Sequence, residues 1–381
     1  MLVAPGTYTG AGNRGIDFGG VDLVLLSEGG AESTVIDCEG ENRGFKFHSG
    51  ETAASLVSGF TIRNGWAPPE GQSPYLENGG GIYCLGSSPT LTNCSITGNS
   101  ADNYGGGIYC DQSSSSMLTN CTIVGNTAES GGGLDCSYGE PMLTNCTIAE
   151  NTAESGGGGL TCWYGSPTLT NCTIVDNTAD AGGGIYTHSS SLAVTNCSIV
   201  GNRARGNNRW DGGGGIYCSR SYLSTLTNCT IAGNTAETGG GIRYSRATLN
   251  STLTNCTITS NTAAAGGGIY FDASSPTLTN CILWNDTSAA VYVDEESEPT
   301  LTHCNVQGGY AGEGNIDADP RFRSFRSFDY VLSPGSPCVD SGTGQNDGIP
   351  WSRVNSAYGQ HNSQAPDMGA YGGPGNLGWV R

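Results

Sequence analysis

The chain has 381 residues, of which 62 are glycine, and only 13% of its residues are charged. Acidic residues outnumber basic residues 34 to 15, which gives a net charge of −19. The abundance of Gly, Thr, Asn and Ser argues against a helical protein, because these residues form helices poorly. The charge excludes nucleic-acid binding, which needs a basic surface. No apolar run reaches the roughly 18 residues that a membrane span requires.

The beginning of the chain is irregular. Residues 1–8 contain neither the basic nor the apolar segment of a signal peptide, so we expect that an upstream segment is missing. Up to about residue 78 we expect irregular coils. In this stretch Gly44-Phe45-Lys46-Phe47 and the segment 59–64 match parts of the repeat that follows.

Residues 79–305 form a regular repeat. A glycine triplet followed by Ile-Tyr opens many units, as at Gly79 and Gly105, and Ile-x-x-Asn follows the cysteines. The string Leu-Thr-Asn-Cys, with small variations, places cysteines mostly 25 to 27 residues apart, at Cys94, Cys121, Cys146, Cys172, Cys197, Cys229, Cys256, Cys281 and Cys304. Each unit holds three short runs of alternating polar and apolar residues. This period predicts an all-β parallel β-solenoid of about ten coils, each with three short strands.

The motifs also resemble a known group of proteins. Gly-Gly-x-Ile with Ile-x-x-Asn is similar to the repeats of polymorphic outer-membrane proteins and related bacterial surface proteins. The resemblance covers roughly residues 20–305 and implies a right-handed parallel β-helix of the pectate-lyase-like superfamily. The segments 317–322, 329–342 and 367–371 resemble a choice-of-anchor Q segment, which closes many secreted β-helix proteins. We therefore divide the chain into a β-helix at 1–305 and an anchor-like cap at 306–381.

Stacked coils align equivalent residues in columns. The asparagines before the cysteines are predicted to occupy tight bends, where Asn tolerates a left-handed backbone, and to form an inward-facing ladder of amides. They are Asn93, Asn120, Asn145, Asn171, Asn196, Asn228, Asn255 and Asn280. Sixteen cysteines are consistent with disulfides and export. Besides the column from Cys94 to Cys304, a second column contains Cys84, Cys110, Cys136, Cys162 and Cys218. Because Phe60 replaces cysteine in the first column and Phe271 in the second, we favour buried thiols that fill the core.

The residue after the first isoleucine of each coil is predicted to face solvent. There Tyr83, Tyr109, Tyr186, Tyr217 and Tyr270 would form an exposed stripe that contacts a polysaccharide, with Trp163 and Tyr164 beside it. Two long turns add Trp66 and Trp210, and long turns on a rigid scaffold commonly carry function. The alternative is that tyrosine merely suits strands and packs across coils.

A second outward face is rich in threonine. The second threonine of Thr-Leu-Thr, or of its variants, is present in nine coils, at Thr92, Thr119, Thr144, Thr170, Thr195, Thr227, Thr254, Thr279 and Thr302. The array resembles the ice-binding face of some β-solenoid antifreeze proteins. Its other threonine column is interrupted by Met117, Met142 and Ala193, and threonine is also an ordinary outward strand residue.

Catalysis is the alternative to binding. The Asn-Thr-Asp, Gly-His-Gly and Arg-x-Pro-x-x-Arg motifs of related pectin-degrading enzymes are absent from the sequence. A lyase or hydrolase could use Asp111 and Asp135, which could also bind Ca²⁺, with Arg243 as a base. No other cofactor is expected.

The repetition of near-identical coils favours a non-catalytic role in surface adhesion, glycan binding or scaffolding, at the cell surface or outside the cell. The partners expected are a polysaccharide or cell-surface glycan, without nucleic acid. An uncapped first coil would expose strand edges, so head-to-tail self-association is a further hypothesis.

Overall fold

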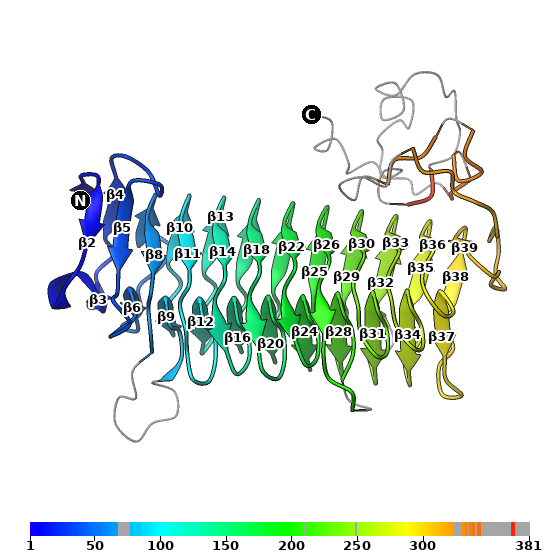
Figure 1. Ribbon diagram of the computed structural model, residues 1–381, viewed down its shortest axis with the longest axis horizontal. Coiled ribbons are helices and arrows are strands. Elements are labelled where there is room, and N and C mark those ends of the chain that lie inside the picture. Colours follow the sequence, from blue (N-terminus) through cyan, green and yellow to red (C-terminus); the bar gives the residue numbers. More distant parts are fainter. Residues whose placement is uncertain are drawn as a thin grey trace.

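The computed structural model describes residues 1–67, 77–208, 211–247, 250–323, 330–333, 335–339, 341–343 and 367–369. These residues form a parallel β-solenoid whose coils stack along one axis (Figure 1). The predicted fold class is confirmed. Two of the three long sheets contain twelve strands and the third contains eleven, close to the ten coils that the repeats indicate.

Each long sheet receives one strand from each successive coil. Sheet A contains β1 (Leu2–Val3), β4 (Val24–Ser27), β7 (Leu56–Ser58), β10 (Thr90–Thr92), β13 (Met117–Thr119), β17 (Met142–Thr144), β21 (Thr168–Thr170), β25 (Ala193–Thr195), β29 (Thr225–Thr227), β32 (Thr252–Thr254), β35 (Thr277–Thr279) and β38 (Thr300–Thr302). Sheet B contains β2 (Gly6–Tyr8), β5 (Thr34–Asp37), β8 (Thr61–Arg63), β11 (Ser95–Thr97), β14 (Thr122–Val124), β18 (Thr147–Ala149), β22 (Thr173–Val175), β26 (Ser198–Val200), β30 (Thr230–Ala232), β33 (Thr257–Thr259), β36 (Ile282–Trp284) and β39 (Asn305–Val306).

Sheet C contains β3 (Ile16–Asp17), β6 (Phe45–Phe47), β9 (Ile82–Leu85), β12 (Ile108–Asp111), β16 (Leu134–Ser137), β20 (Leu160–Trp163), β24 (Ile185–His188), β28 (Ile216–Ser219), β31 (Ile242–Ser245), β34 (Ile269–Asp272) and β37 (Val291–Val293). A short fourth sheet contains β15 (Thr127–Ala128), β19 (Thr152–Ala153), β23 (Thr178–Ala179) and β27 (Arg203–Ala204). The sequence did not predict this sheet. A single 3-10 turn, η1 (Ala11–Asn13), lies near the start of the described chain.

One continuous apolar core runs through the stack. The first isoleucine or leucine of each sheet C strand from β9 to β34 is fully buried, as are most of the central residues of sheets A and B. Because the strands pair in register, each apolar residue packs on its equivalent in the next coil. The stacking therefore buries a core that no single coil could bury.

The glycine triplets are required by close backbone contact. A Cβ on Gly106 would lie 2.3 Å from the carbonyl oxygen of Thr127 and 2.6 Å from that of Gly132. Gly105 also has a φ of +66°, a conformation that side chains with a Cβ disfavour. Neighbouring coils can therefore approach closely at this corner only where the side chain is absent.

All 16 cysteines are buried and none forms a disulfide, so the prediction of buried thiols is confirmed. The thiols of the nine-membered column sit at the bend between sheets A and B. Cys121 Sγ, for example, lies 3.5 Å from the carbonyl oxygen of Leu91 in the preceding coil. Burial raises the pKa of Cys218 to about 11. These thiols behave as small core residues.

The predicted asparagine ladder exists but faces outward, so its expected direction was wrong. Each of its asparagines has a φ between +53° and +56°, as the bend requires. The Nδ2 of Asn120 donates to Asn93 Oδ1 at 3.2 Å, and the contact repeats coil by coil as far as Asn228. Asn93 is exposed. We call this column the outer Asn ladder.

A second, inner Asn ladder lies inside the solenoid, at the end of each Ile-x-x-Asn motif. It contains the buried residues Asn99, Asn126, Asn151, Asn177, Asn202, Asn234 and Asn261. Asn151 shows the pattern: its Nδ2 donates to Asn177 Oδ1 at 2.9 Å and to the carbonyl oxygen of Ile123 at 3.0 Å. Asp286 ends the ladder and accepts from the Nδ2 of Asn261. These bonds satisfy the polar groups at a buried corner.

The described parts of the C-terminal segment pack on the outside of sheet B, over its last coils (Figure 1). Tyr330 packs on Val200 and Ala232, while Cys338 and Met368 pack on Ile282. The backbone of Thr343 bonds to the side chain of the outer-ladder residue Asn280. This covering buries Asn280, the last member of the outer Asn ladder.

Candidate functional site

The expected tyrosine stripe on sheet C is largely buried, so the prediction of a solvent-facing stripe was wrong. Tyr83, Tyr109 and Tyr217 expose 1%, 2% and 3% of their surface. Tyr186 and Tyr270 are half-buried, and burial raises the pKa of Tyr186 to about 12. The three buried rings cannot contact a polysaccharide in this conformation.

The turn before each glycine triplet causes this burial. It runs back across the outward face of sheet C and lies over the neighbouring coil. Tyr104 stacks on Tyr109 with 6.4 Å between ring centroids, and the hydroxyl of Ser130 bonds to that of Thr161 at 3.2 Å. A Cβ on Gly156 would lie 3.1 Å from the ring of Tyr186. The rings therefore pack between coils, as the alternative interpretation of tyrosine proposed.

The two candidate catalytic acids are buried with them. Asp135 has no exposed surface and Asp111 has 6%. Asp111 accepts a hydrogen bond from the Tyr109 hydroxyl at 2.9 Å, and Asp135 accepts one from Ser137 at 3.2 Å. Burial, and then the charge of Asp111, raises the pKa of Asp135 well above its usual range.

The two acids lie close enough to interact, as predicted. The prediction that substrate and Ca²⁺ can reach them was wrong. The fully buried carboxyl of Asp135 is a poor Ca²⁺ ligand, because Ca²⁺ prefers charged and accessible oxygens. Across the described ranges, no cluster of three or more His, Cys, Asp or Glu residues could hold a metal ion.

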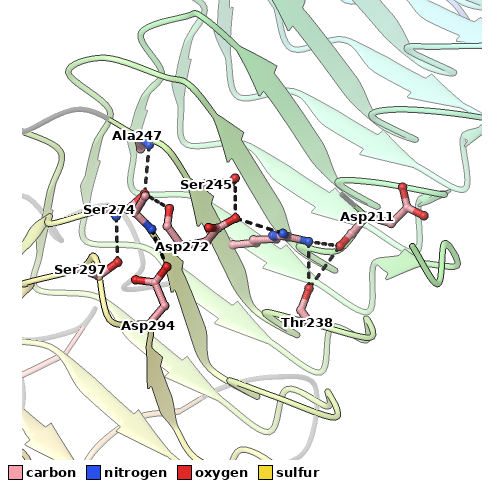
Figure 2. Close-up of polar contacts among 10 residues, drawn as sticks. Asp211, Thr238, Ser245, Ala247, Asp272, Ser274, Asp294 and Ser297 are labelled. Atoms are coloured by element: carbon pink, nitrogen blue, oxygen red, sulfur yellow. Dashed lines mark hydrogen bonds and ion pairs between the residues drawn. The ribbon is translucent and has the colours of Figure 1, made fainter. Parts of the chain in front are cut away.

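Arg243 is also buried, with 3% exposed, so its expected role as an accessible base is wrong. Its guanidinium lies between the rings of Tyr217 and Tyr270, at 5.1 and 5.4 Å from their centroids. It donates to the carbonyl oxygen of Asp211 and approaches Asp272 Oδ2 at 3.4 Å. Figure 2 shows Asp211 and Thr238 on one side of this cluster and Ser245 and Asp272 on the other. Cation–π and ionic contacts hold three coils together here.

A different surface carries exposed aromatic rings. After each sheet C strand from β16 to β31, the chain turns outward through one left-handed residue. These residues are Tyr138, Tyr164, Ser189, Arg220 and Arg246, with φ between +49° and +56°. The backbone N–H of Tyr138 bonds to the carbonyl of Trp163, and that of Tyr164 to the carbonyl of His188. The five residues thus form a row with one residue per coil, which we call the ridge.

The first half of the ridge is aromatic. Tyr138 and Tyr164 are 59% and 52% exposed, and their rings stack with centroids 5.1 Å apart. Trp163 and His188 lie beside them, with 4.6 Å between their ring centroids. Burial, and then the charge of Arg220, lowers the pKa of His188, so its imidazole is neutral at neutral pH. We call Tyr138, Trp163, Tyr164 and His188 the aromatic patch.

The sequence analysis identified only part of this surface. It named Trp163 and Tyr164 but missed Tyr138 and Arg220. Aligning the cysteines of β16 and β20 would have found Tyr138, because Ser137-Tyr138-Gly139 then matches the segment 163–165. Of the two turn tryptophans, Trp66 is half-buried and forms a β-bridge with Ser100. Trp210 lies outside the described residues.

The comparison with protein-family models agrees with this architecture. Residues 12–208, 80–245 and 207–317 match the family model of the right handed beta helix region. The chain belongs to the right-handed β-helix family. Among solved structures, this β-helix is similar to the crystal structure of pectate lyase Pel9A, with 15% identity and a TM-score of 0.48. That match covers 97% of this chain and 86% of the other. No curated protein matches.

The described part of this β-helix contains no helix long and apolar enough to cross a membrane.

Proposed function

We propose that this β-helix is a non-catalytic carbohydrate-binding protein of the bacterial cell surface, and that the aromatic patch is its binding site. The exposed, stacked pair Tyr138 and Tyr164 is the observation that carries the proposal. Aromatic rings combine a large apolar face with a polar edge, which suits a sugar ring that has C–H groups on its faces and hydroxyls around its rim. Exposed apolar patches commonly mark interaction sites.

The rigidity of the patch supports the same role. Trp163 ends β20 and His188 ends β24, so in-register pairing fixes their spacing. Tyr138 and Tyr164 are held by backbone hydrogen bonds to the next coil. A preorganised surface loses little conformational entropy when it binds a ligand. The resemblance of the repeats to bacterial surface proteins, and of the C-terminal segment to one that closes secreted β-helix proteins, supports the proposed location.

Retention on insoluble polysaccharides tests the proposal. We expect the wild-type protein to be retained, and the double variant Tyr138→Ala/Tyr164→Ala to lose about tenfold or more in affinity, because aromatic residues dominate binding energies of this kind. Tyr292→Ala is the matched control, since Tyr292 is an exposed sheet C tyrosine outside the patch. Equal retention of the double variant and the control would refute the assignment of the site.

The same samples test the alternative activity. A polysaccharide lyase would release unsaturated products that absorb in the ultraviolet, and a glycoside hydrolase would release reducing ends. We expect neither from the wild-type protein, because Asp111, Asp135 and Arg243 are buried. Formation of either product would overturn the non-catalytic proposal.

The threonine face supports a second candidate function, ice binding. The nine threonines from Thr92 to Thr302 lie in register on sheet A, and each is half-buried. If this face binds ice, the wild-type protein should produce a gap between the melting and freezing points of the solution. Thr170→Lys, in the middle of the array, should remove this gap. Absence of the gap in the wild-type protein would dismiss this candidate.

A further inference from the structure

The second half of the ridge is basic. Arg220 and Arg246 follow Tyr138, Tyr164 and Ser189 in the next two coils, and both arginines are exposed. Neighbouring coils are separated by about 4.8 Å, the spacing of paired strands. Arg220 therefore begins roughly 10 Å along the axis from Tyr164. A polymer that lay along the ridge would meet two aromatic rings, a hydroxyl and then two guanidinium groups.

Arg220 lies in a strongly acidic protein. Acidic residues outnumber basic ones 34 to 15, and several other arginines are neutralised. Arg14 pairs with Glu39, and Arg63 with Asp37. Arg220 forms no ion pair with any residue of the described ranges, although its charge acts on His188 in the aromatic patch. An exposed arginine beside an aromatic patch is thus available to a ligand.

Acidic residues flank the ridge at both ends. Glu140 is exposed and lies two residues after Tyr138, while Asp272 ends β34, one coil beyond Arg246. A negatively charged group would be repelled by the acids at either end of the ridge and attracted at Arg220, which lies between them. The guanidinium fork can donate two parallel hydrogen bonds to a carboxylate or sulfate.

We propose that the ridge binds an anionic polysaccharide, with sugar rings on Tyr138 and Tyr164 and an acidic substituent on Arg220. This inference rests on the proposed carbohydrate binding and adds the chemical class of the ligand. The net charge of −19 repels a polyanion at long range, while Arg220 attracts it locally. Salt screens both effects, so ionic strength is a poor test and ligands matched in structure are needed.

The test uses two matched pairs of polysaccharides with the full chain. Alginate is compared with carboxyl-reduced alginate, which lacks the carboxylates, and dextran sulfate is compared with unmodified dextran. We expect the wild-type protein to bind the acidic member of at least one pair roughly tenfold more tightly, which is typical of hydrogen bonds to charged groups. The pair that shows the preference identifies the acidic group as a carboxylate or a sulfate.

Three variants assign the preference to the ridge. Arg220→Gln should remove most of the preference for the acidic polymer, while its affinity for the neutral polymer stays within about twofold of that of the wild-type protein. Arg220→Lys should keep part of the preference. Arg203→Gln is the control, because Arg203 is an exposed arginine on β27, away from the ridge. An equal loss in Arg203→Gln would attribute the preference to total charge and overturn the inference.

The two proposals fail in different ways. If the wild-type protein binds neither member of either pair, the proposed carbohydrate binding fails, and this inference fails with it. If it binds both members of a pair equally and Arg220→Gln binds as wild type does, carbohydrate binding stands and the anionic ligand is wrong. Preference for an acidic polymer that survives Arg220→Gln would also overturn the role of Arg220.

Discussion

Asp286 ends the inner Asn ladder, and the variant Asp286→Asn tests how the ladder works. Its Oδ1 accepts hydrogen bonds from the backbone N–H and the Nδ2 of Asn261, at 2.7 and 3.0 Å. Its Oδ2 occupies the place where other ladder residues carry an NH₂ group. That oxygen has no hydrogen-bond partner, and the residue is only 9% exposed.

Burial raises the pKa of Asp286 from 3.8 to about 8. The folded protein therefore keeps this carboxyl protonated at neutral pH, while the unfolded chain ionises it. Because the folded state binds the additional proton, the free energy of unfolding falls as the pH rises from about 4 to about 8, and it levels off above that. At about 1.4 kcal/mol per pH unit, the contribution near neutral pH reaches at most about 4 kcal/mol.

Asp286→Asn should remove this penalty. The new Nδ2 would donate to the carbonyl of Ile258, as the Nδ2 of Asn261 donates to that of Ile231. We expect the variant to be more stable at pH 7 by about 1–3 kcal/mol, allowing for water that reaches the wild-type carboxyl. Urea denaturation at pH 4, 6 and 8 measures the difference. Hydrogen exchange of the β36 amides shows whether the last coils account for it, since solenoids can unfold in parts.

The mid-ladder variant Asn261→Asp is the control. It introduces a carboxyl at the same kind of site, so its stability should fall as the pH rises. Similar pH dependence of the wild-type protein and Asp286→Asn, or lower stability of that variant at pH 7, would refute the reasoning.

Three further predictions concern the coils. Asn151→Ala should lower the free energy of unfolding by about 2–5 kcal/mol, because it leaves buried donors on Asn126 unpaired. Asn145→Gly, in the exposed outer Asn ladder, should lower the free energy of unfolding by less than about 1 kcal/mol. Equal losses of the two variants in urea denaturation would contradict the difference between the ladders. Gly158→Ala should prevent folding, because the new Cβ would lie 2.5 Å from the carbonyl oxygen of Gly183. A soluble variant with native circular dichroism would show that the corner at the glycine triplets can expand. A thiol reagent should label none of the 16 cysteines in the native protein and all of them after denaturation; rapid labelling of folded protein would contradict the burial of the two columns.

The repeat made the fold predictable. A fixed period aligns like residues in successive coils, so the isoleucine and cysteine columns could be assigned to the core before any coordinates were known. The left-handed bends at Asn93 and its equivalents followed from the tolerance of asparagine for that conformation. The direction of their side chains did not follow, because residues on both sides of a bend can point inward.

The site was harder to predict for the same reason. Period-two alternation correctly places Tyr83 and Tyr109 on the outer side of sheet C, but it says nothing about what lies above them. The turn before each glycine triplet covers that side, and Arg243 and Asp135 are buried beneath it. Tyr138 follows its strand, in a turn that leads away from the sheet, so it stays exposed.

The sequence by itself therefore determined the coil, its period and its apolar inward columns, because each depends on contacts between equivalent residues one repeat apart. Tertiary structure alone decided which outward residues reach solvent. That depends on the path of the turns and of the C-terminal segment over the sheets, which the alternation of residues within a strand does not define. The ridge, with aromatic rings at one end and Arg220 toward the other, emerges only when the coils are stacked.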